Sequence, residues 1–349
     1  MNTKRITLKD IALECGLAIS TVSNILNDQK DSFASGRVKL QVKEVAERLG
    51  YKKDFLSVSL RTKRTYSIGL CIDEVGNETR RFFIKTFVSR FNEKGYEVAL
   101  QGHSFSPQKA LQSLKFFEER YKDGIVMFLD FLKPKDEDFE TLTQALQKSQ
   151  CRVMGIGSAC KGILPCHDID RPWAFRDGIR RLRGLGHRKI LIVYKSKYHY
   201  REAYEDFCSE TFVHMDEVDT PEGFMQRWDS AYREHPDITA IFFRSDVVGV
   251  KSADWLQRMR NFRIPQDLCI LSFDNFSYAD YSNPRISTYD INMSRLGDEC
   301  FESLYHWIDS DQKPDNSSYK LVKPIYVERD SMGASLSENI KPSFILSSL

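Results

Sequence analysis

Residues 6–27 read ITLKDIALECGLAISTVSNILN, the pattern of two short helices joined by a tight turn. The first helix is predicted to begin at Thr7, which fits a capping box with Asp10, and to end near Gly16. The second is predicted over residues 21–26, with its apolar side chains at helical spacing. This stretch therefore predicts a helix-turn-helix.

A third helix is expected over residues 36–49, closed by Gly50, so that three short helices share one small core. The outward face of the second helix carries small or polar side chains, which suit base edges and phosphates in a major groove. These are Ile19, Ser20, Thr21, Ser23 and Asn24. The same face also fits the solvated surface of an ordinary three-helix module, and helix spacing alone leaves both interpretations open.

Charge is distributed unevenly along the 349 residues, although the whole chain carries only +2. Residues 1–65 hold thirteen Lys and Arg against seven Asp and Glu, a net charge of +6, so residues 66–349 carry −4. A basic head on a mildly acidic body favours a polyanionic partner for the head.

The chain's beginning resembles the LacI/GalR transcriptional regulators. The matching marks are Thr7-Leu8-Lys9-Asp10-Ile11-Ala12, Cys15-Gly16-Leu17-Ala18, Thr21-Val22-Ser23, Leu26-Asn27, Arg37 and Leu49-Gly50-Tyr51. The resemblance implies that the second helix lies in the major groove, with Ile19, Ser20 and Asn24 at base-reading positions. Thr21, Ser23 and Asn27 match positions that hold phosphates or support the helix, and Thr7 and Tyr51 complete the expected DNA-binding set of the head. Asn24 replaces the family's frequent Arg, which leaves the operator sequence open.

Residues 52–65 link the head to the body. Their mixed, basic composition fits a flexible linker. The resemblance instead implies a hinge helix that orders on DNA, with Leu60 at the position that wedges the minor groove. The expected domains are residues 1–51 (helix-turn-helix), 52–65 (hinge), 66–331 (two-lobed body) and 332–349 (tail).

From residue 66 onward, apolar strands alternate with amphipathic helices, which predicts an α/β body with parallel sheets. Seven strands are expected, at 67–72, 97–100, 124–129, 152–156, 189–194, 240–243 and 268–273. Seven helices are expected, at 80–94, 107–120, 137–149, 174–185, 222–234, 249–261 and 294–309. These elements fit two lobes that enclose a cleft at the carboxyl ends of their strands. Residues 167–170 are interpreted as a surface turn, with a supply of polar pocket groups as the alternative.

The body resembles the family's periplasmic-binding-protein-like core, which implies that Arg201 and Asp274 bond a small polar effector. Ser245 stands where a ligand-bonding Asn is common, beside the family's Asp at Asp246. From the first lobe, strand-end geometry proposes Asp73 (or Glu74) and Ser158. The loop 195–200 is basic and aromatic; it can stack on a sugar or attract an anionic ligand, and it fits an exposed loop equally well.

Catalysis finds no support in the sequence, which has neither a P-loop nor a G-x-S-x-G motif, and no cofactor or metal is expected. The expected protein is a cytoplasmic homodimer that binds a near-palindromic double-stranded operator, a repressor controlled by a carbohydrate-like effector. One alternative is a regulator whose body binds a protein corepressor or no ligand. Another is a solute-binding protein or a sugar-modifying enzyme, neither of which needs the basic head.

Overall fold

The structure of the protein is a computed structural model, which describes residues 6–26, 34–51, 59, 62–73, 78–120, 122–133, 137–194 and 212–333. The chain forms two compact units, Met1–Thr65 and Tyr66–Leu349. Among the expected site residues, Asn27, Leu60, Glu74 and Arg201 lie outside the described residues, as do the loop 195–200 and the tail from 334.

The first unit contains three helices, α1 (Leu8–Cys15), α2 (Ile19–Leu26) and α3 (Gly36–Arg48). The Asp10 carboxylate accepts hydrogen bonds from the amide of Thr7 at 2.8 Å and from its hydroxyl at 2.6 Å, which confirms the predicted start of α1. Gly16 ends α1 in the left-handed conformation with φ of 67°, where a residue without Cβ is favoured. All three helices contribute to one core of Ile11, Ala12, Val22, Ile25, Val42, Val45 and Ala46.

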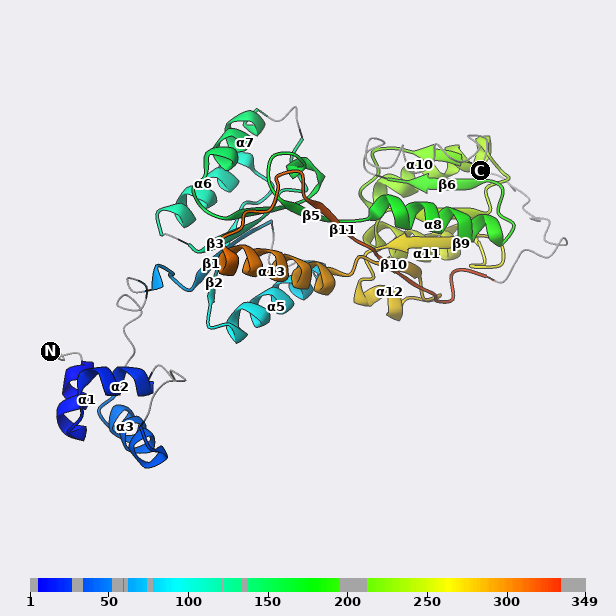
Figure 1. Cartoon of the computed structure of the whole chain (residues 1–349). Coiled ribbons are helices and arrows are strands. Elements are labelled where there is room, and N and C mark those ends of the chain that lie inside the picture. The colour runs from blue at the N-terminus through cyan, green and yellow to red at the C-terminus, as the bar shows by residue number, and fades with distance from the viewer. Residues whose placement is uncertain are drawn as a thin grey trace. The chain divides into compact units, whose positions relative to one another are not determined.

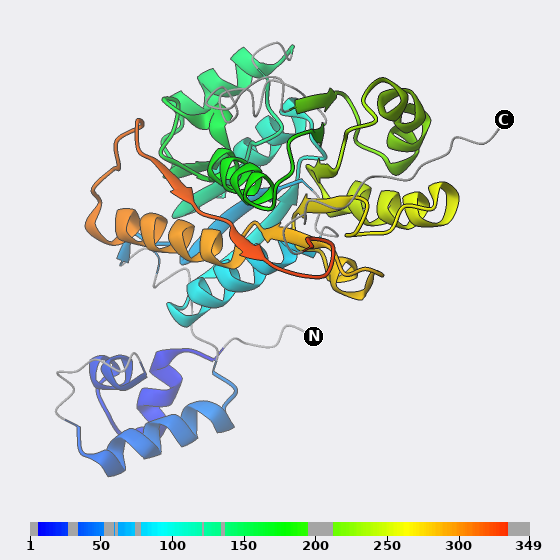
Figure 2. The same cartoon turned by 90° about the vertical axis from the view of Figure 1, so that its right-hand side faces the viewer.

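The second unit has two lobes, and lobe 1 is built on a six-stranded parallel sheet in the order β11-β5-β4-β3-β1-β2. Its strands are β1 (Ser67–Ile72), β2 (Glu97–Gly102), β3 (Gly124–Phe128), β4 (Val153–Ile156), β5 (Cys166–Ile169) and β11 (Tyr319–Val322). Its helices are α5 (Glu78–Glu93), α6 (Pro107–Glu118), α7 (Phe139–Lys148) and α13 (Met293–Ser310), with a short 3-10 turn η1 (Ser158–Cys160). Figures 1 and 2 both show α5 and α13 side by side.

Lobe 2 is built on a second six-stranded sheet, in the order β12-β10-β9-β8-β6-β7, in which only β12 is antiparallel to its neighbour. Its strands are β6 (Ile190–Val193), β7 (Phe212–Met215), β8 (Ala240–Phe243), β9 (Cys269–Phe273), β10 (Ser287–Asp290) and β12 (Ile325–Val327). Its helices are α8 (Arg171–Gly184), α10 (Pro221–Glu234), α11 (Asp246–Arg260) and α12 (Ser277–Tyr281). The observed architecture confirms the predicted α/β body with two parallel-sheet lobes.

The chain passes between the lobes three times, from β5 to α8, from β10 to α13 and from β11 to β12 (Figure 1). Two of these crossings are joined, since the amide of Asp170 donates to the carbonyl of Val322 at 2.8 Å. The crossings are short and lie together, so they form the natural axis for a change in lobe orientation.

The packing of α5 against α13 explains why periodicity predicted α5 well. Phe83, Phe87 and Phe91 repeat every four residues, and all three are fully buried. Their rings lie 5.3 and 4.8 Å apart along the helix, and Phe91 meets Phe301 of α13 edge-on at 4.9 Å. Aromatic pairs in such arrangements add to the stabilisation from buried area.

The prediction of seven strands was incomplete, because the described residues hold twelve. The interpretation of residues 167–170 as a surface turn was wrong. Residues 166–169 form the fully buried strand β5 between β4 and β11. Its polar side chains find partners inside the lobe, where His167 lies 3.2 Å from the hydroxyl of Ser303 and Tyr319 donates to Asp168 at 3.1 Å.

Candidate functional site

The exposed face of α2 is the first candidate site. Val22 and Ile25 are buried in the head's core, whereas Ile19 is 48% exposed and Ser20 is also exposed. An apolar side chain that stays half exposed at the start of a short helix can contact a thymine methyl in a major groove. Helix packing therefore separates core positions from candidate contact positions in α2.

The described part of the head holds five more of the expected DNA-binding residues. Thr21, Ser23 and Asn24 are half-buried on α2, so their polar groups lie at the edge of the core. Thr7 is exposed at the N-cap of α1, and Tyr51 is half-buried just after α3. The structure thus gives the head an exposed apolar and polar edge on a rigid three-helix support.

The second candidate site is a cleft of about 960 Å³ lined by both lobes of the body. It lies beyond the carboxyl ends of parallel strands, where open α/β sheets bind ligands. Lobe 1 contributes Asp73, Thr79, Arg80, Phe105, Gln108, Asp130 and Phe131, and lobe 2 contributes Glu217, Asp219, Arg244, Ser245, Val247, Asp274 and Phe276. Arg171, at a crossing between the lobes, also lines the cleft.

On the lobe 1 side, Arg80 is held between two carboxylates. Its Nε donates to Asp73 at 3.0 Å and its Nη2 donates to Asp130 at 2.8 Å. Burial disfavours the ionised form of Asp130, but the charges of Arg80 and Arg171 outweigh burial and lower its pKa. Gly157, with φ of 117°, lets the turn after β4 approach this group, since a Cβ there would lie 2.6 Å from the Cα of Asp130.

On the lobe 2 side, Asp274 follows β9 and accepts a hydrogen bond from the hydroxyl of Ser245 at 2.8 Å. Burial raises the pKa of Asp274, although the positive charge of Arg244 opposes the rise. The two walls of the cleft therefore each offer a carboxylate beside a guanidinium. Such paired donors and acceptors match the hydroxyl groups of a small polar ligand.

Aromatic side chains flank these polar groups. Phe131 stacks on the buried ring of His103 with ring centroids 4.5 Å apart, and Phe276 stacks on Tyr278 at 5.3 Å. Phe131 and Phe276 line the cleft from opposite lobes. Flat apolar rings beside carboxylates and guanidiniums suit a ring-shaped ligand that has both apolar faces and polar edges.

Comparison with known proteins agrees with this architecture. A family model described as a periplasmic binding protein-like domain matches residues 179–332. The HTH-type transcriptional regulator TreR of Salmonella typhimurium is 24% identical over 87% of this chain and 94% of its own length. The ribose operon repressor of Halalkalibacterium halodurans is 25% identical over 95% of this chain and 99% of its own length.

Among solved structures, the lac repressor dimer bound to operator and the anti-inducer ONPF matches with a TM-score of 0.77 at 16% identity, covering 95% of this chain and 100% of that chain. A complex of the transcriptional regulator CelR with cellobiose matches with a TM-score of 0.62 at 19% identity, covering 94% and 100%. The head sequence, the two lobes and the regulators that match along nearly the whole chain agree. The chain belongs to the LacI/GalR family.

In this LacI/GalR protein, the expected effector residues divide into two groups. Asp73, Ser245 and Asp274 line the cleft. Ser158 is exposed in η1 and is not among the residues that line the cleft. A role for Ser158 in effector binding stays a prediction.

Asp246 does not line the cleft either. It is fully buried, and its carboxylate accepts from the amide of Phe276 and from the hydroxyl of Thr288, both at 2.9 Å. Burial, with a smaller contribution from the charge of Asp274, raises the pKa of Asp246 to about 7. Asp246 therefore supports the cleft wall from behind instead of facing the ligand space.

Sequence reasoning missed most of the charged residues that line the cleft, among them Arg80, Asp130, Arg171 and Arg244. Asp130 and Arg244 come directly after the β3 and β8 regions, so the strand-end rule that selected Asp73 also points to them. Arg80 and Arg171 lie in the first turns of α5 and α8, where the sequence gives no comparable signal.

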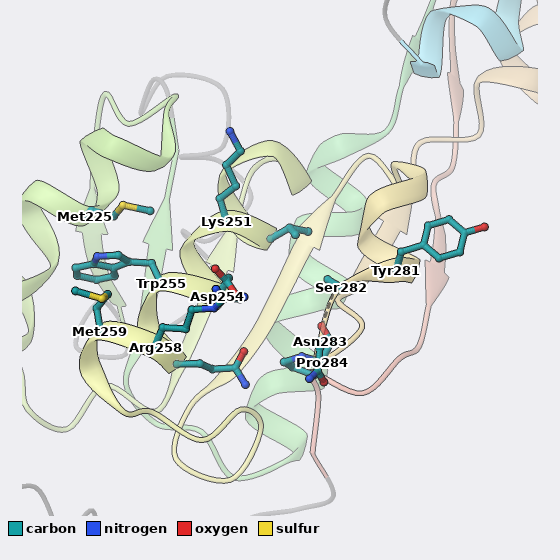
Figure 3. Close-up of a pocket in the computed structure, with 13 residues that line it drawn as sticks. Met225, Lys251, Asp254, Trp255, Arg258, Met259, Tyr281, Ser282, Asn283 and Pro284 are labelled. Carbon is teal, nitrogen blue, oxygen red and sulfur yellow. Dashed lines mark hydrogen bonds and ion pairs between the residues drawn. The ribbon is translucent and has the colours of Figure 1, made fainter.

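A separate groove of about 840 Å³ lies on lobe 2, between α11 and residues 281–284. Figure 3 shows Met225, Trp255 and Met259 gathered at one end, with Tyr281 projecting at the other. Tyr281 is 86% exposed and Met259 is 61% exposed. The groove thus carries a large exposed side chain at each end, and exposed apolar groups of this size are typical of contact surfaces.

In the described part of the chain, no group of His, Cys, Asp or Glu residues has the arrangement of a metal site. No helix among these residues is both long and apolar enough to span a bilayer.

Proposed function

We propose that the protein is a sequence-specific DNA-binding transcriptional repressor whose activity is controlled by a small polar effector in the cleft between its lobes. The observation that carries this proposal is a helix-turn-helix head joined to a two-lobed, cleft-bearing body in one LacI/GalR chain. The cellobiose bound by CelR supports a sugar or a sugar derivative as the effector class.

In the proposed DNA complex, α2 lies in the major groove. Ile19, Ser20 and Asn24 read base edges, and Thr21 and Ser23 contact phosphates or support the helix. Thr7, Asn27 and Tyr51 add contacts outside the base-reading set, and Leu60 wedges the minor groove from the hinge. Residues 1–51, 52–65, 66–331 and 332–349 are the head, the hinge, the effector-binding body and the tail.

In the proposed switch, an effector bound between Asp73 and Asp274 changes the orientation of the lobes about their three crossings. Ser245 and Arg201 complete its polar contacts on lobe 2. Because a ligand shifts an equilibrium only by its differential affinity for the two states, the effector must bind one lobe arrangement better, typically by 1–3 kcal/mol.

The protein acts as a cytoplasmic homodimer that places two heads on a near-palindromic operator, with half-sites roughly one helical turn apart. The lobe 2 groove with Tyr281 and Met259 is the surface that we assign to the second copy, since large exposed apolar groups are enriched at such contacts. The lac repressor dimer on its operator supports this assembly.

No catalytic step is part of the proposal, since the relatives reported above are regulators and the cleft groups pair with one another. The alternative regulator, controlled by a protein corepressor or by no ligand, differs in the cleft. It predicts that no small molecule raises the melting temperature of the body.

The DNA-binding proposal is tested by selecting genomic fragments with the full-length protein and measuring their affinity at about 0.15 M salt. The selected site should bind about 10³-fold or more tighter than random DNA. Ile19→Ala and Asn24→Ala should each weaken it by 1–3 kcal/mol, roughly 5- to 150-fold. Leu13→Ala is the control, because Leu13 is 85% exposed on α1 rather than α2. Equal affinity for selected and random DNA would overturn the proposal.

The effector proposal is tested by a thermal-shift screen of neutral sugars, sugar phosphates and nucleobases. Asp274→Asn should reduce the shift caused by a true effector, because the carboxylate acceptor is lost. Asp237→Asn changes an exposed acid after α10 and should leave the shift intact. A shift that Asp274→Asn leaves unchanged would place the effector elsewhere.

A further inference from the structure

Glu78 and Ser277 join the two lobes through a side-chain contact, in addition to the three chain crossings. Glu78 is the first residue of α5 in lobe 1, and Ser277 is the first residue of α12 in lobe 2. One carboxylate oxygen of Glu78 accepts from the amide of Ser277 at 3.1 Å, and the other accepts from its hydroxyl at 3.1 Å. Between described residues, the other side-chain hydrogen bonds from one lobe to the other lie within the chain crossings themselves.

The segment that carries Ser277 is fixed from below by lobe 2. Asp246 accepts from the amide of Phe276 at 2.9 Å, so the residue before Ser277 is anchored to α11. Asn275 donates to Asp290 at 3.1 Å and accepts from Arg329 at 2.7 Å. Ser277 therefore moves with lobe 2, and its contact with Glu78 reports the position of lobe 1.

This segment also has an unusual backbone. Asp274 and Asn275 lie in succession at φ of 104° and 54°. Positive φ is uncommon for residues other than Gly, so the surrounding contacts must hold the conformation. Strained segments of this kind occur at ligand clamps and switch regions.

Both halves of the contact adjoin the cleft wall. Thr79 and Arg80, which follow Glu78, line the cleft from lobe 1, and Asp274 and Phe276, which precede Ser277, line it from lobe 2. A ligand that contacts Arg80 and Asp274 at the same time acts directly on the residues beside each partner. The cleft and the contact thus share the same two short segments, one in each lobe.

We propose that the Glu78–Ser277 contact is a latch that fixes the relative orientation of the lobes and couples the cleft to operator binding. The proposal rests on the function proposed above and adds its switching element. When the latch is closed, Glu78 holds α12 through two charge-assisted hydrogen bonds, which are stronger than neutral ones. Opening the latch releases lobe 1 to turn about the crossings.

Two variants break the latch from opposite sides. Glu78→Ala removes the acceptor, and Ser277→Pro removes both donors. Proline suits the first position of a helix, and Phe276 already has the extended backbone, with ψ of 148°, that a residue before proline prefers. Glu93→Ala is the matched control, because Glu93 ends the same helix α5 at an exposed position and bonds only Ser89 of its own lobe among the described residues.

The first readout is hydrogen exchange in the full-length protein, which needs neither operator nor effector. In Glu78→Ala, the amide of Ser277 should exchange at least tenfold faster. The amide of Phe276, bonded within lobe 2, should keep its rate, which shows that the fold is intact. Unchanged protection of Ser277 would overturn the latch.

The second readout is affinity for the operator selected with the unmodified protein. Glu78→Ala and Ser277→Pro should change it at least threefold in the same direction, and the double variant should change it no further, because both break one contact. Additive effects, or a change no larger than that of Glu93→Ala, would overturn the coupling. If the unmodified protein selects no operator, the proposed function fails, while the exchange experiment still decides whether the latch exists.

Discussion

Arg80 donates to Asp73 on one side and to Asp130 on the other, so that one guanidinium joins the ends of β1 and β3 at the floor of the cleft. The side chain of Arg80 is only 10% exposed. An ion pair so deeply buried adds little to the free energy of unfolding compared with apolar side chains in its place. Removal of one partner alone is strongly destabilising, because the other charge stays buried without it.

We therefore expect Arg80→Ala to lower the free energy of unfolding by about 3–5 kcal/mol, because Asp73 and Asp130 would lose the guanidinium that is hydrogen-bonded to both. Urea denaturation measures the change. Arg295→Ala is the control, since Arg295 forms a largely exposed pair with Glu299 on α13 and should cost less than about 1 kcal/mol. Equal losses for the two variants would contradict the central position of Arg80.

Two glycines of α8 should respond oppositely to substitution by alanine. A Cβ on Gly178 would lie 2.6 Å from the ring of Phe242, so Gly178→Ala should destabilise the protein by about 1–3 kcal/mol or more. Gly184, at the end of the same helix, has no atom within 4 Å of a Cβ, so Gly184→Ala should be neutral or stabilise by up to about 1 kcal/mol. Thermal unfolding separates the two, and the same sign for both would contradict the close packing of α8 on the lobe 2 sheet.

His187 should make the protein less stable in mild acid. Burial lowers the pKa of His187 to about 4, whereas an unfolded histidine titrates near 6.5. Between these values the unfolded chain binds the proton more tightly, so the free energy of unfolding falls as pH falls from about 6.5 toward 4. The loss from this residue should reach about 1–2 kcal/mol at pH 5.

Replacing His187 with Gln removes this titration. Urea midpoints measured from pH 7.5 to pH 5 should then decline less steeply than in the unmodified protein, even if the variant starts lower because the 2.9 Å contact with Thr239 is altered. Parallel pH dependences would show that His187 does not remain neutral in the folded protein.

Tyr281 provides the test of the proposed dimer surface. Tyr281→Asp places a charge on the groove of lobe 2 and should convert dimers to monomers at micromolar concentration, as measured by size exclusion with light scattering. Leu321→Asp is the matched control, because Leu321 is 45% exposed on β11 of lobe 1. A Tyr281→Asp variant that stays dimeric would move the interface elsewhere.

The helices could be predicted from sequence more fully than the strands. Helix α5 could be predicted from Phe83, Phe87 and Phe91, because their spacing places all three on the same buried face of the helix. In contrast, β10 (Ser287–Asp290) has no apolar run, although Ser287 and Thr288 are fully buried. Their hydroxyls find partners such as Asp246, which is 42 residues away from Thr288, and single-sequence patterns do not record such distant pairings.

Some of the cleft residues could be predicted from the sequence and others could not. Asp73 was predicted because strand ends in parallel sheets mark ligand sites, and Asp274 was predicted from the family resemblance. Arg80 could not, because its partner Asp130 lies 50 residues farther along the chain. Adjacent residues at the start of α11 also differ in a way that the sequence does not record, since Ser245 lines the cleft and Asp246 accepts a hydrogen bond from Thr288 behind it.

The three crossings also govern the order in which the body can be completed during synthesis. Lobe 1 starts at β1 but needs α13 and its edge strand β11, which are translated only after lobe 2 has been made up to β10. Until then, the Phe83, Phe87 and Phe91 face of α5 lacks Phe301, its partner on α13. Lobe 1 therefore cannot finish folding on the ribosome before most of lobe 2 has been made. A chain truncated before residue 293 would expose an aromatic stripe that favours aggregation.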